Sequence, residues 1–196
     1  MTSKDHLTYL RQLTEESANL RRDWIEKQAK ELGELIAVIA GVIGSGGKIL
    51  IAGNGGSASD ASHFAAEMVV RLTAERNRQA LPALALGMDP SVVTAASNDF
   101  GYDSMFARQV EALGNANDML FAISTSGNSA NLIKAVAVAK EKGLITVGLL
   151  GNDGGRLAEQ VDRSLIIPHD STQRIQEEHI FIIHYLVEAV ESDLFG

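Results

Sequence analysis

The chain has 196 residues, of which 45% are hydrophobic, so it is long and apolar enough for one sizeable core. Lys and Arg number 17 against 25 Asp and Glu, and this net charge of −8 argues against the basic surface that a nucleic-acid partner requires. The lack of cysteine excludes disulfides, thiolate metal ligands and cysteine nucleophiles, and no stretch has the roughly 18 consecutive apolar residues of a membrane span. We therefore expect a soluble cytoplasmic protein with neither nucleic acid nor membrane as a partner.

The first 45 residues contain no proline, and their leucines recur at helical spacing. They predict two N-terminal helices, which the glycine-rich stretch 44–47 ends. Residues 48–196 then predict an α/β core that a long helix over about 173–194 closes. We expect residues 1–196 to form a single domain, with no linker or repeat.

Short apolar runs alternate with helix-like segments through the core. Strands are predicted at 48–53, 83–87, 118–124, 145–151 and 163–168, and helices between them at 57–75, 129–143 and 154–160. This alternation is typical of βαβ units, whose strands are parallel. We predict an α/β three-layer sandwich of the flavodoxin-like kind, with a five-stranded parallel sheet and additional N-terminal helices.

Two of the loops that follow strands have the composition of a phosphate site. The stretch 54–57 reads Asn-Gly-Gly-Ser and the stretch 124–129 reads Ser-Thr-Ser-Gly-Asn-Ser, each directly before a helix, where free N–H groups favour an anion. Ser57 and Ser129 could instead only cap their helices. Because neither loop has a P-loop lysine or the dinucleotide glycine order, a small phosphate monoester suits them better than a nucleotide. A third glycine-rich stretch, 151–155, is interpreted as a turn.

Metal ligation has to come from His, carboxylate or amide groups. His63 and Glu67 are four residues apart on a predicted helix, so they share a face and can hold one divalent ion, although such a pair alone is more often a simple surface pair. Gln176, His179 and His184 in the last helix offer further ligands. Spacing alone does not decide between His179 and His184.

Four stretches together resemble the sedoheptulose 7-phosphate isomerases, or phosphoheptose isomerases, of the sugar isomerase (SIS) domain superfamily. They are AGNGGSASDASHFAAE at 52–67, ASNDFGYDSMFARQVEALG at 96–114, AISTSGNSANLIKA at 122–135 and RIQEEHIFIIH at 174–184. The loops alone are shared by many SIS proteins, whereas their combination with the two ligand pairs is specific for this family. The resemblance covers most of residues 30–196.

The resemblance implies a set of site residues, all of the family's residue type. Substrate contacts fall on Asn54, Gly55, Gly56, Glu67 and Gln176, with Asn98 and Asp99 on the sugar chain and Ser57, Ser124, Thr125, Ser126 and Ser129 on the phosphate. His63, Glu67, Gln176 and His184 would bind Zn²⁺, and Glu67 and His184 would be the acid–base pair. The resemblance also implies a homotetramer that acts on a small sugar phosphate.

The implied reaction converts sedoheptulose 7-phosphate to D-glycero-D-manno-heptose 7-phosphate by zinc-assisted proton transfer through an enediolate. Glu67 cannot be a tight zinc ligand and an effective base at the same instant, so we expect it to act as a base when weakly bound or displaced. Two alternatives stay open: a non-enzymatic SIS regulator that binds a sugar phosphate or the replication initiator, and an isomerase of another phosphorylated ketose. The complete ligand set favours the enzyme.

The ligand set poses a geometric problem. Eight residues of α-helix rise about 12 Å, so Gln176 and His184 on one helix could hardly reach the same ion. Either Gln176 precedes the helix, or the two ligands come from different chains, which makes the active sites interfacial. We expect the second arrangement.

Overall fold

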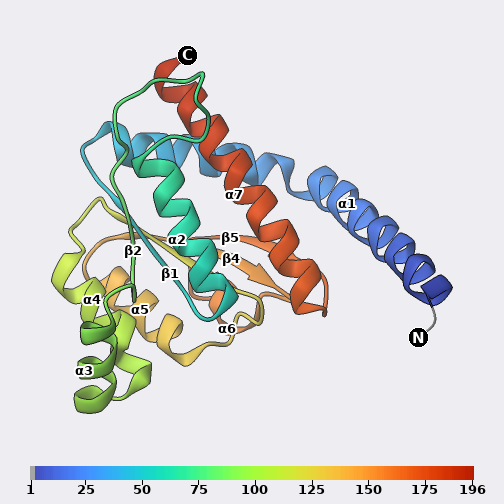
Figure 1. Ribbon diagram of the computed structural model, residues 1–196. Coiled ribbons are helices and arrows are strands. Elements are labelled where there is room, and N and C mark those ends of the chain that lie inside the picture. The colour runs from blue at the N-terminus through green and yellow to red at the C-terminus, as the bar shows by residue number, and fades with distance from the viewer. Residues whose placement is uncertain (1–2) are drawn as a thin grey trace.

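The computed structural model describes residues 3–196 and shows one sheet between two layers of helices (Figure 1). In chain order the elements are α1 (Ser3–Gly44), β1 (Ile49–Gly53), α2 (Gly56–Val69), β2 (Ala83–Ala85), α3 (Pro90–Phe100), the 3₁₀ helix η1 (Tyr102–Ser104), α4 (Met105–Leu113), β3 (Met119–Ser124), α5 (Ala130–Glu141), β4 (Ile145–Gly151), α6 (Gly155–Ala158), β5 (Arg163–Ile167) and α7 (Thr172–Phe195). All five strands are parallel, in the order β2-β1-β3-β4-β5. The predicted α/β sandwich with a five-stranded parallel sheet is confirmed.

The sheet separates two apolar cores, because successive strand residues point to opposite faces. Ile49 and Ile51 belong to the core beneath α1, α2 and α7. Leu50 and Ala52 belong to the core beneath α3, α4 and α5. Burial on both faces explains why these strands read as continuous apolar runs in the sequence.

The N-terminal segment differs from the prediction of two helices, which is wrong. It is a single helix, α1, because Gly33 in its interior costs only about 1 kcal/mol and no proline interrupts it. Its N-terminal part extends away from the body (Figure 1). Its later part packs on the sheet, where Trp24 is buried and donates its indole N–H to the carbonyl oxygen of Ile166 at 2.8 Å. This bond occupies a backbone acceptor of β5, which is an edge strand.

Two of the elements are shorter than predicted. The helix expected over 57–75 ends at Val69, and the strand expected over 83–87 contains only Ala83–Ala85, because Gly87 turns the chain with a φ of 79°. The helices α3 and α4 occupy a segment to which the sequence analysis assigned no element. No helix within residues 3–196 is long and apolar enough to cross a membrane.

The strand order places the two candidate phosphate loops side by side. β1 pairs with β3, with Gly53 opposite Ile123, so both loops leave the same edge of the sheet from neighbouring strands. The chain proceeds from β1 toward one side of the sheet and from β3 toward the other. Open parallel sheets bind their ligands at such a switch point, because the outgoing loops diverge and leave a crevice there.

Candidate active site

The first loop presents the open start of α2. Gly55 precedes this helix with a φ of 56°, and no side chain caps it. Ser57 lies inside the helix, where its backbone N–H donates to the carbonyl oxygen of Asn54 at 3.0 Å. Ser57 is therefore not the cap. The N–H groups of Ala58 and Ser59 donate to the carbonyl oxygen of Gly55, so among the described residues the N–H of Gly56 is the one in this turn without a backbone acceptor and can bind an anion.

The second loop gathers hydroxyl groups before α5. Ser124 is buried, accepts a hydrogen bond from the N–H of Gly127 at 3.1 Å, and lies with its Oγ 3.5 Å from the Oγ of Ser129. Ser129 precedes α5, yet its side chain makes no capping bond. Ser126 is exposed, and its Oγ accepts from the N–H of Asn128 at 3.2 Å. The hydroxyl of Ser129 thus does not cap α5, so the interpretation of Ser129 as a helix cap alone is wrong.

A pair of side-chain amides, the half-buried Asn54 and the buried Asn131, joins the first loop to the start of α5. Asn54 and Asn131 exchange hydrogen bonds through their side chains, at 3.0 Å and 2.8 Å, and the hydroxyl of Tyr102 donates to Oδ1 of Asn54 at 2.9 Å. Asn131, only 2% exposed, also accepts from the N–H of Leu132. The sequence analysis missed Asn131 and Tyr102. A polar residue within the first turn of a helix that follows a hydroxyl-rich loop was the available signal for Asn131.

Asn98 and Asp99 lie at the exposed end of α3. The side chain of Asn98 donates to that of Asp99 at 2.8 Å, and neither has a hydrogen bond to the phosphate loops among the described residues. Tyr102, in the next short helix, is the residue of this segment that reaches Asn54. The expected contact of Asn98 and Asp99 with the sugar chain stays a prediction.

The glycine-rich stretch 151–155 supports the serine loop from behind. The side chain of Asn152 donates to the carbonyl oxygen of Thr125 at 2.9 Å. The backbone N–H of Leu157 donates to the carbonyl oxygen of Gly127, also at 2.9 Å. A Cβ on Gly127 would lie 1.9 Å from the carbonyl oxygen of Gly154, so only glycine fits. The stretch is a turn, as interpreted from the sequence.

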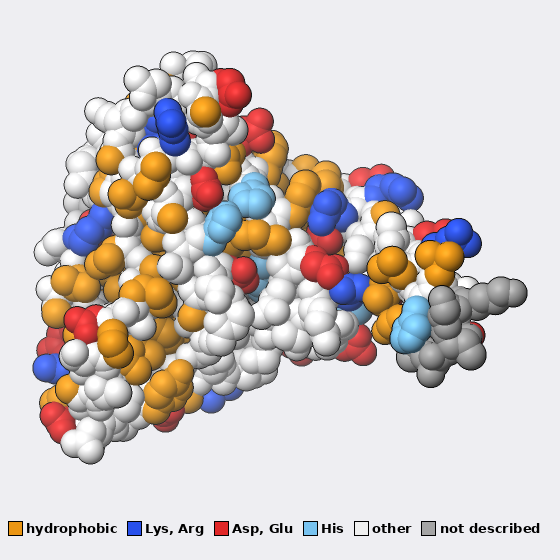
Figure 2. Space-filling view, in the orientation of Figure 1, with side chains coloured by type: hydrophobic (Ala, Val, Ile, Leu, Met, Phe, Trp, Pro, Cys, Tyr) orange, Lys and Arg blue, Asp and Glu red, His pale blue; other side chains and the backbone are white. Residues whose placement is uncertain are grey.

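Three of the predicted metal-site residues meet where α2 and α7 lie side by side. Nε2 of His63 is 3.0 Å from Nε2 of His184 and 3.3 Å from Oε1 of Glu67. Histidine side chains gather on this exposed face (Figure 2). Within residues 3–196 no group of three His, Asp or Glu side chains is already arranged around a common ion, so the cluster consists of two close pairs that share His63.

Of the two histidines of α7, His184 is the one that contacts His63. His179 is fully buried, with no hydrogen-bond partner for either ring nitrogen among the described residues, and no hydrogen bond or ion pair joins it to His63 or Glu67. Burial, opposed by the nearby backbone of Leu150, lowers the pKa of His179 to about 4. At neutral pH it is therefore an uncharged core residue.

Gln176 lies near the start of α2, away from the cluster of His63, Glu67 and His184. Its side chain sits beside Gly56, where an added Cβ would be 2.3 Å from Nε2 of Gln176. The separation from His184 is eight residues within α7, or about 12 Å along the axis. Because α7 begins at Thr172, the arrangement in which Gln176 precedes the helix is wrong. Within one chain, Gln176 borders the phosphate loop and the other three residues form the cluster.

The chain is similar to known proteins over most of its length. Residues 12–151 match the model of the SIS domain. The phosphoheptose isomerase of Geobacter metallireducens is 46% identical over 98% of this chain and 99% of its own length, and that of Methylibium petroleiphilum is 46% identical over 92% and 91%. The chain belongs to the phosphoheptose isomerase family. It is therefore an enzyme of the aldose–ketose isomerase class.

Solved structures of phosphoheptose isomerases have the same fold. The one from Neisseria gonorrhoeae is 40% identical, with a TM-score of 0.88 over 95% of this chain and 98% of that one. The one from Francisella tularensis is 33% identical, with a TM-score of 0.91 over 98% and 100%. The long α1 and the parallel sheet thus belong to the architecture that this chain shares with other phosphoheptose isomerases.

A further carboxyl group of this phosphoheptose isomerase lies near the cluster and escaped the sequence analysis. Asp60 precedes His63 by one turn of α2, and its Oδ2 is buried without a hydrogen-bond partner. Burial raises the pKa of Asp60, and the neighbouring His63 opposes the shift. The signal in the sequence was the spacing of three residues, which places both side chains on one side of the helix.

Proposed function

We propose that this phosphoheptose isomerase converts sedoheptulose 7-phosphate to D-glycero-D-manno-heptose 7-phosphate. The observation that carries the proposal is the position of the two functional regions on α2. The helix begins at the phosphate loops, bears His63 about two turns later, roughly 10 Å along its axis, and bears Glu67 one turn further on. An extended seven-carbon sugar phosphate fits a site with this separation between an anion anchor and an acid–base pair.

The phosphate end is held by hydroxyls and helix N-termini. Ser124, Ser126 and Ser129 supply hydroxyl donors, and the starts of α2 and α5 supply backbone N–H groups. Neither loop contains Lys or Arg. Binding energy from this remote group orients C1 and C2 of the sugar, which lowers the barrier for the chemical step.

The reacting end needs a group that moves a proton between two carbons. The carboxylate of Glu67 takes the proton from C1 of the ketose, which leaves an enediolate, and returns it to C2. His184 gives a proton to O2 and takes one from O1, so the product is the aldose and both side chains regain their initial states. The contacts of His63 with both groups keep them on one side of the substrate.

The spacings within the two close pairs that share His63 suit ligands of a zinc ion. Two ligands at about 2.0–2.1 Å from a tetrahedral zinc lie roughly 3.3–3.4 Å apart, close to the 3.0 Å and 3.3 Å observed around His63. His63, Glu67 and His184 would hold the ion, with Gln176 as the fourth ligand. When bound, zinc supplies a Lewis acid that stabilises negative charge on the substrate oxygens.

The fourth ligand leads to the proposed assembly. Gln176 of the same chain lies about 12 Å along α7 from His184, so the amide that completes the set belongs to a neighbouring subunit. We therefore propose a homotetramer with interfacial active sites. The part of α1 that extends from the body carries exposed Leu7, Tyr9 and Leu10, which a second copy of the chain can cover.

The experiment is incubation of the purified protein with sedoheptulose 7-phosphate, followed by NMR detection of the aldoheptose 7-phosphate. Glu67→Gln is the matched variant, because it keeps the size of the side chain and an oxygen ligand but removes the base. Its turnover is expected to fall by ~10²–10⁴. Absence of product with the wild-type protein would refute the substrate, and unchanged turnover of the variant would refute Glu67 as the base.

A further inference from the structure

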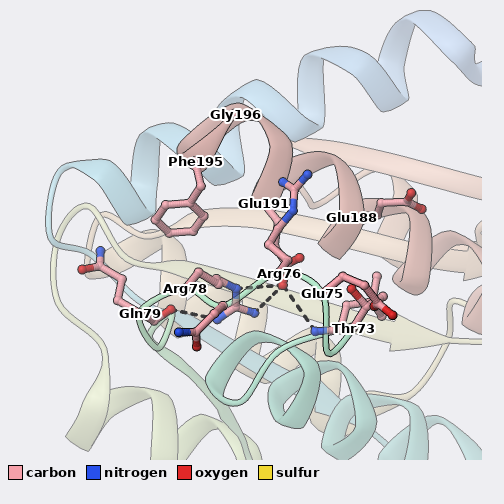
Figure 3. A pocket seen from close by; sticks show the side chains of 11 residues that line it. Thr73, Glu75, Arg76, Arg78, Gln79, Glu188, Glu191, Phe195 and Gly196 are labelled. Atoms are coloured by element: carbon pink, nitrogen blue, oxygen red, sulfur yellow. Dashed lines mark hydrogen bonds and ion pairs between the residues drawn. The ribbon is translucent and has the colours of Figure 1, made fainter.

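A buried arginine closes the end of α2 that lies beyond Glu67. Arg78 is in the segment between α2 and β2, and only 1% of its side chain is exposed. Its guanidinium donates to the carbonyl oxygens of Glu67, Met68 and Gln79 at 2.8, 2.7 and 2.9 Å. Its Nε and Nη2 both contact Oε1 of Glu191 at 2.7 Å (Figure 3). All the N–H groups of the guanidinium therefore have partners.

These contacts join the two helices of the active site. The carbonyls of Glu67 and Met68 belong to the last turn of α2, where no intrahelical donor is available. Glu191 is on α7, about two turns after His184, and it also accepts from the N–H of Leu72 at 3.3 Å. The acid–base cluster thus lies between the close approach of Gln176 to Gly56 on one side and the Arg78–Glu191 pair on the other.

Stability alone is a weak reason for such a pair. Burying two charges costs several kcal/mol per ion, and apolar residues of similar volume often replace a buried ion pair without loss of stability. What an apolar residue cannot do is bind two carbonyls of one helix and a carboxylate of another at fixed distances. The planar fork of an arginine does this, whereas a lysine offers a single nitrogen.

We propose that Arg78 is a positioning residue for the isomerisation. Through its bonds to α2 and to Glu191 it sets the distance between the Glu67 carboxylate and His184. The inference rests on the proposed function, in which Glu67 moves the proton. It assigns a role in turnover to a side chain that lies at the end of α2 opposite to the phosphate loops.

The test compares kcat and KM of Arg78→Lys and Glu191→Gln with those of the wild type. Because misplacement of a reacting group by about 1 Å costs up to ~10²-fold, kcat is expected to fall roughly 10- to 100-fold. KM should stay near the wild-type value, since the phosphate loops are not touched. Arg76→Lys is the matched control, because this arginine is in the same segment and its Nη1 has no hydrogen-bond partner. The kcat of this variant should equal that of the wild type.

Chemical rescue separates positioning from a purely structural role. A cavity of about 820 Å³ is lined by Arg76, Arg78 and Glu191, so a small cation can reach the place that Arg78→Ala vacates. Guanidinium chloride at millimolar concentration should restore part of kcat, and sodium chloride at equal ionic strength should not. Circular dichroism and sedimentation verify the fold and the assembly of each variant. If the Arg78 variants do not fold, the kcat of Glu191→Gln decides whether the Arg78–Glu191 pair positions the catalytic groups.

Unchanged kcat in folded Arg78→Lys and Glu191→Gln, with Glu67→Gln inactive, overturns the positioning role and leaves the proposed function intact. Full activity of Glu67→Gln overturns the role of Glu67 and the positioning inference with it. A loss of kcat in both variants, restored by guanidinium in Arg78→Ala, supports the inference.

Discussion

The buried His179 should make the protein lose stability in mild acid. Its pKa is lowered from an ordinary value of 6.5 to about 4, with burial as the main cause. Between these two pH values the unfolded chain binds a proton at this residue and the folded chain does not. Stability therefore falls as the pH is lowered from about 6.5 toward 4. At about 1.4 kcal/mol per pKa unit, the total loss from this one side chain is about 3 kcal/mol.

The assay is denaturant unfolding at several pH values between 7.5 and 4.5, at a constant protein concentration because subunit association contributes to stability. His179→Leu removes the titrating ring and leaves no polar atom to bury. The difference in unfolding free energy between variant and wild type should shift in favour of the variant by about 2–3 kcal/mol from pH 7.5 to 4.5. Ile182→Leu, a buried change on the same helix, controls for repacking. A difference that does not vary with pH would refute the reasoning.

Three further predictions concern the site. Chelation should remove zinc and isomerase activity while the far-UV circular dichroism persists, since the sheet does not depend on the ion; full turnover without metal would contradict a role in catalysis. Ser124→Ala and Ser129→Ala should raise KM for the phosphorylated ketose, and the unphosphorylated ketose should be a poor substrate for the wild type; equal efficiency on both sugars would remove the phosphate assignment. Mixed oligomers of His184→Ala and Gln176→Ala subunits should regain part of the activity that each variant lacks; mixed oligomers as inactive as their parents would exclude ligands from different chains.

Local signals in the sequence were sufficient for most of the fold. The central strands β1, β3 and β4 are buried on both faces, so each one is a short, continuous apolar run bounded by glycine or polar residues. The ends of the helices were harder to predict from the sequence. α2 ends at Val69, where Arg78, nine residues later, bonds to the carbonyls of the last turn, and this partner is not adjacent to the helix end in the sequence.

The sequence by itself determined the parts of the site that depend on neighbours along the chain. The four-residue spacing of His63 and Glu67 fixes their common face, and the hydroxyl run 124–129 follows its strand directly. The tertiary structure alone decided which distant residues join them. His179 and His184 are five residues apart on one apolar helix and differ only in what packs against them: the core around Leu150 for the first, and α2 for the second. The amide pair of Asn54 and Asn131 likewise exists because β1 and β3 are neighbours in the sheet, which is a property of strand order and leaves no local pattern in the sequence.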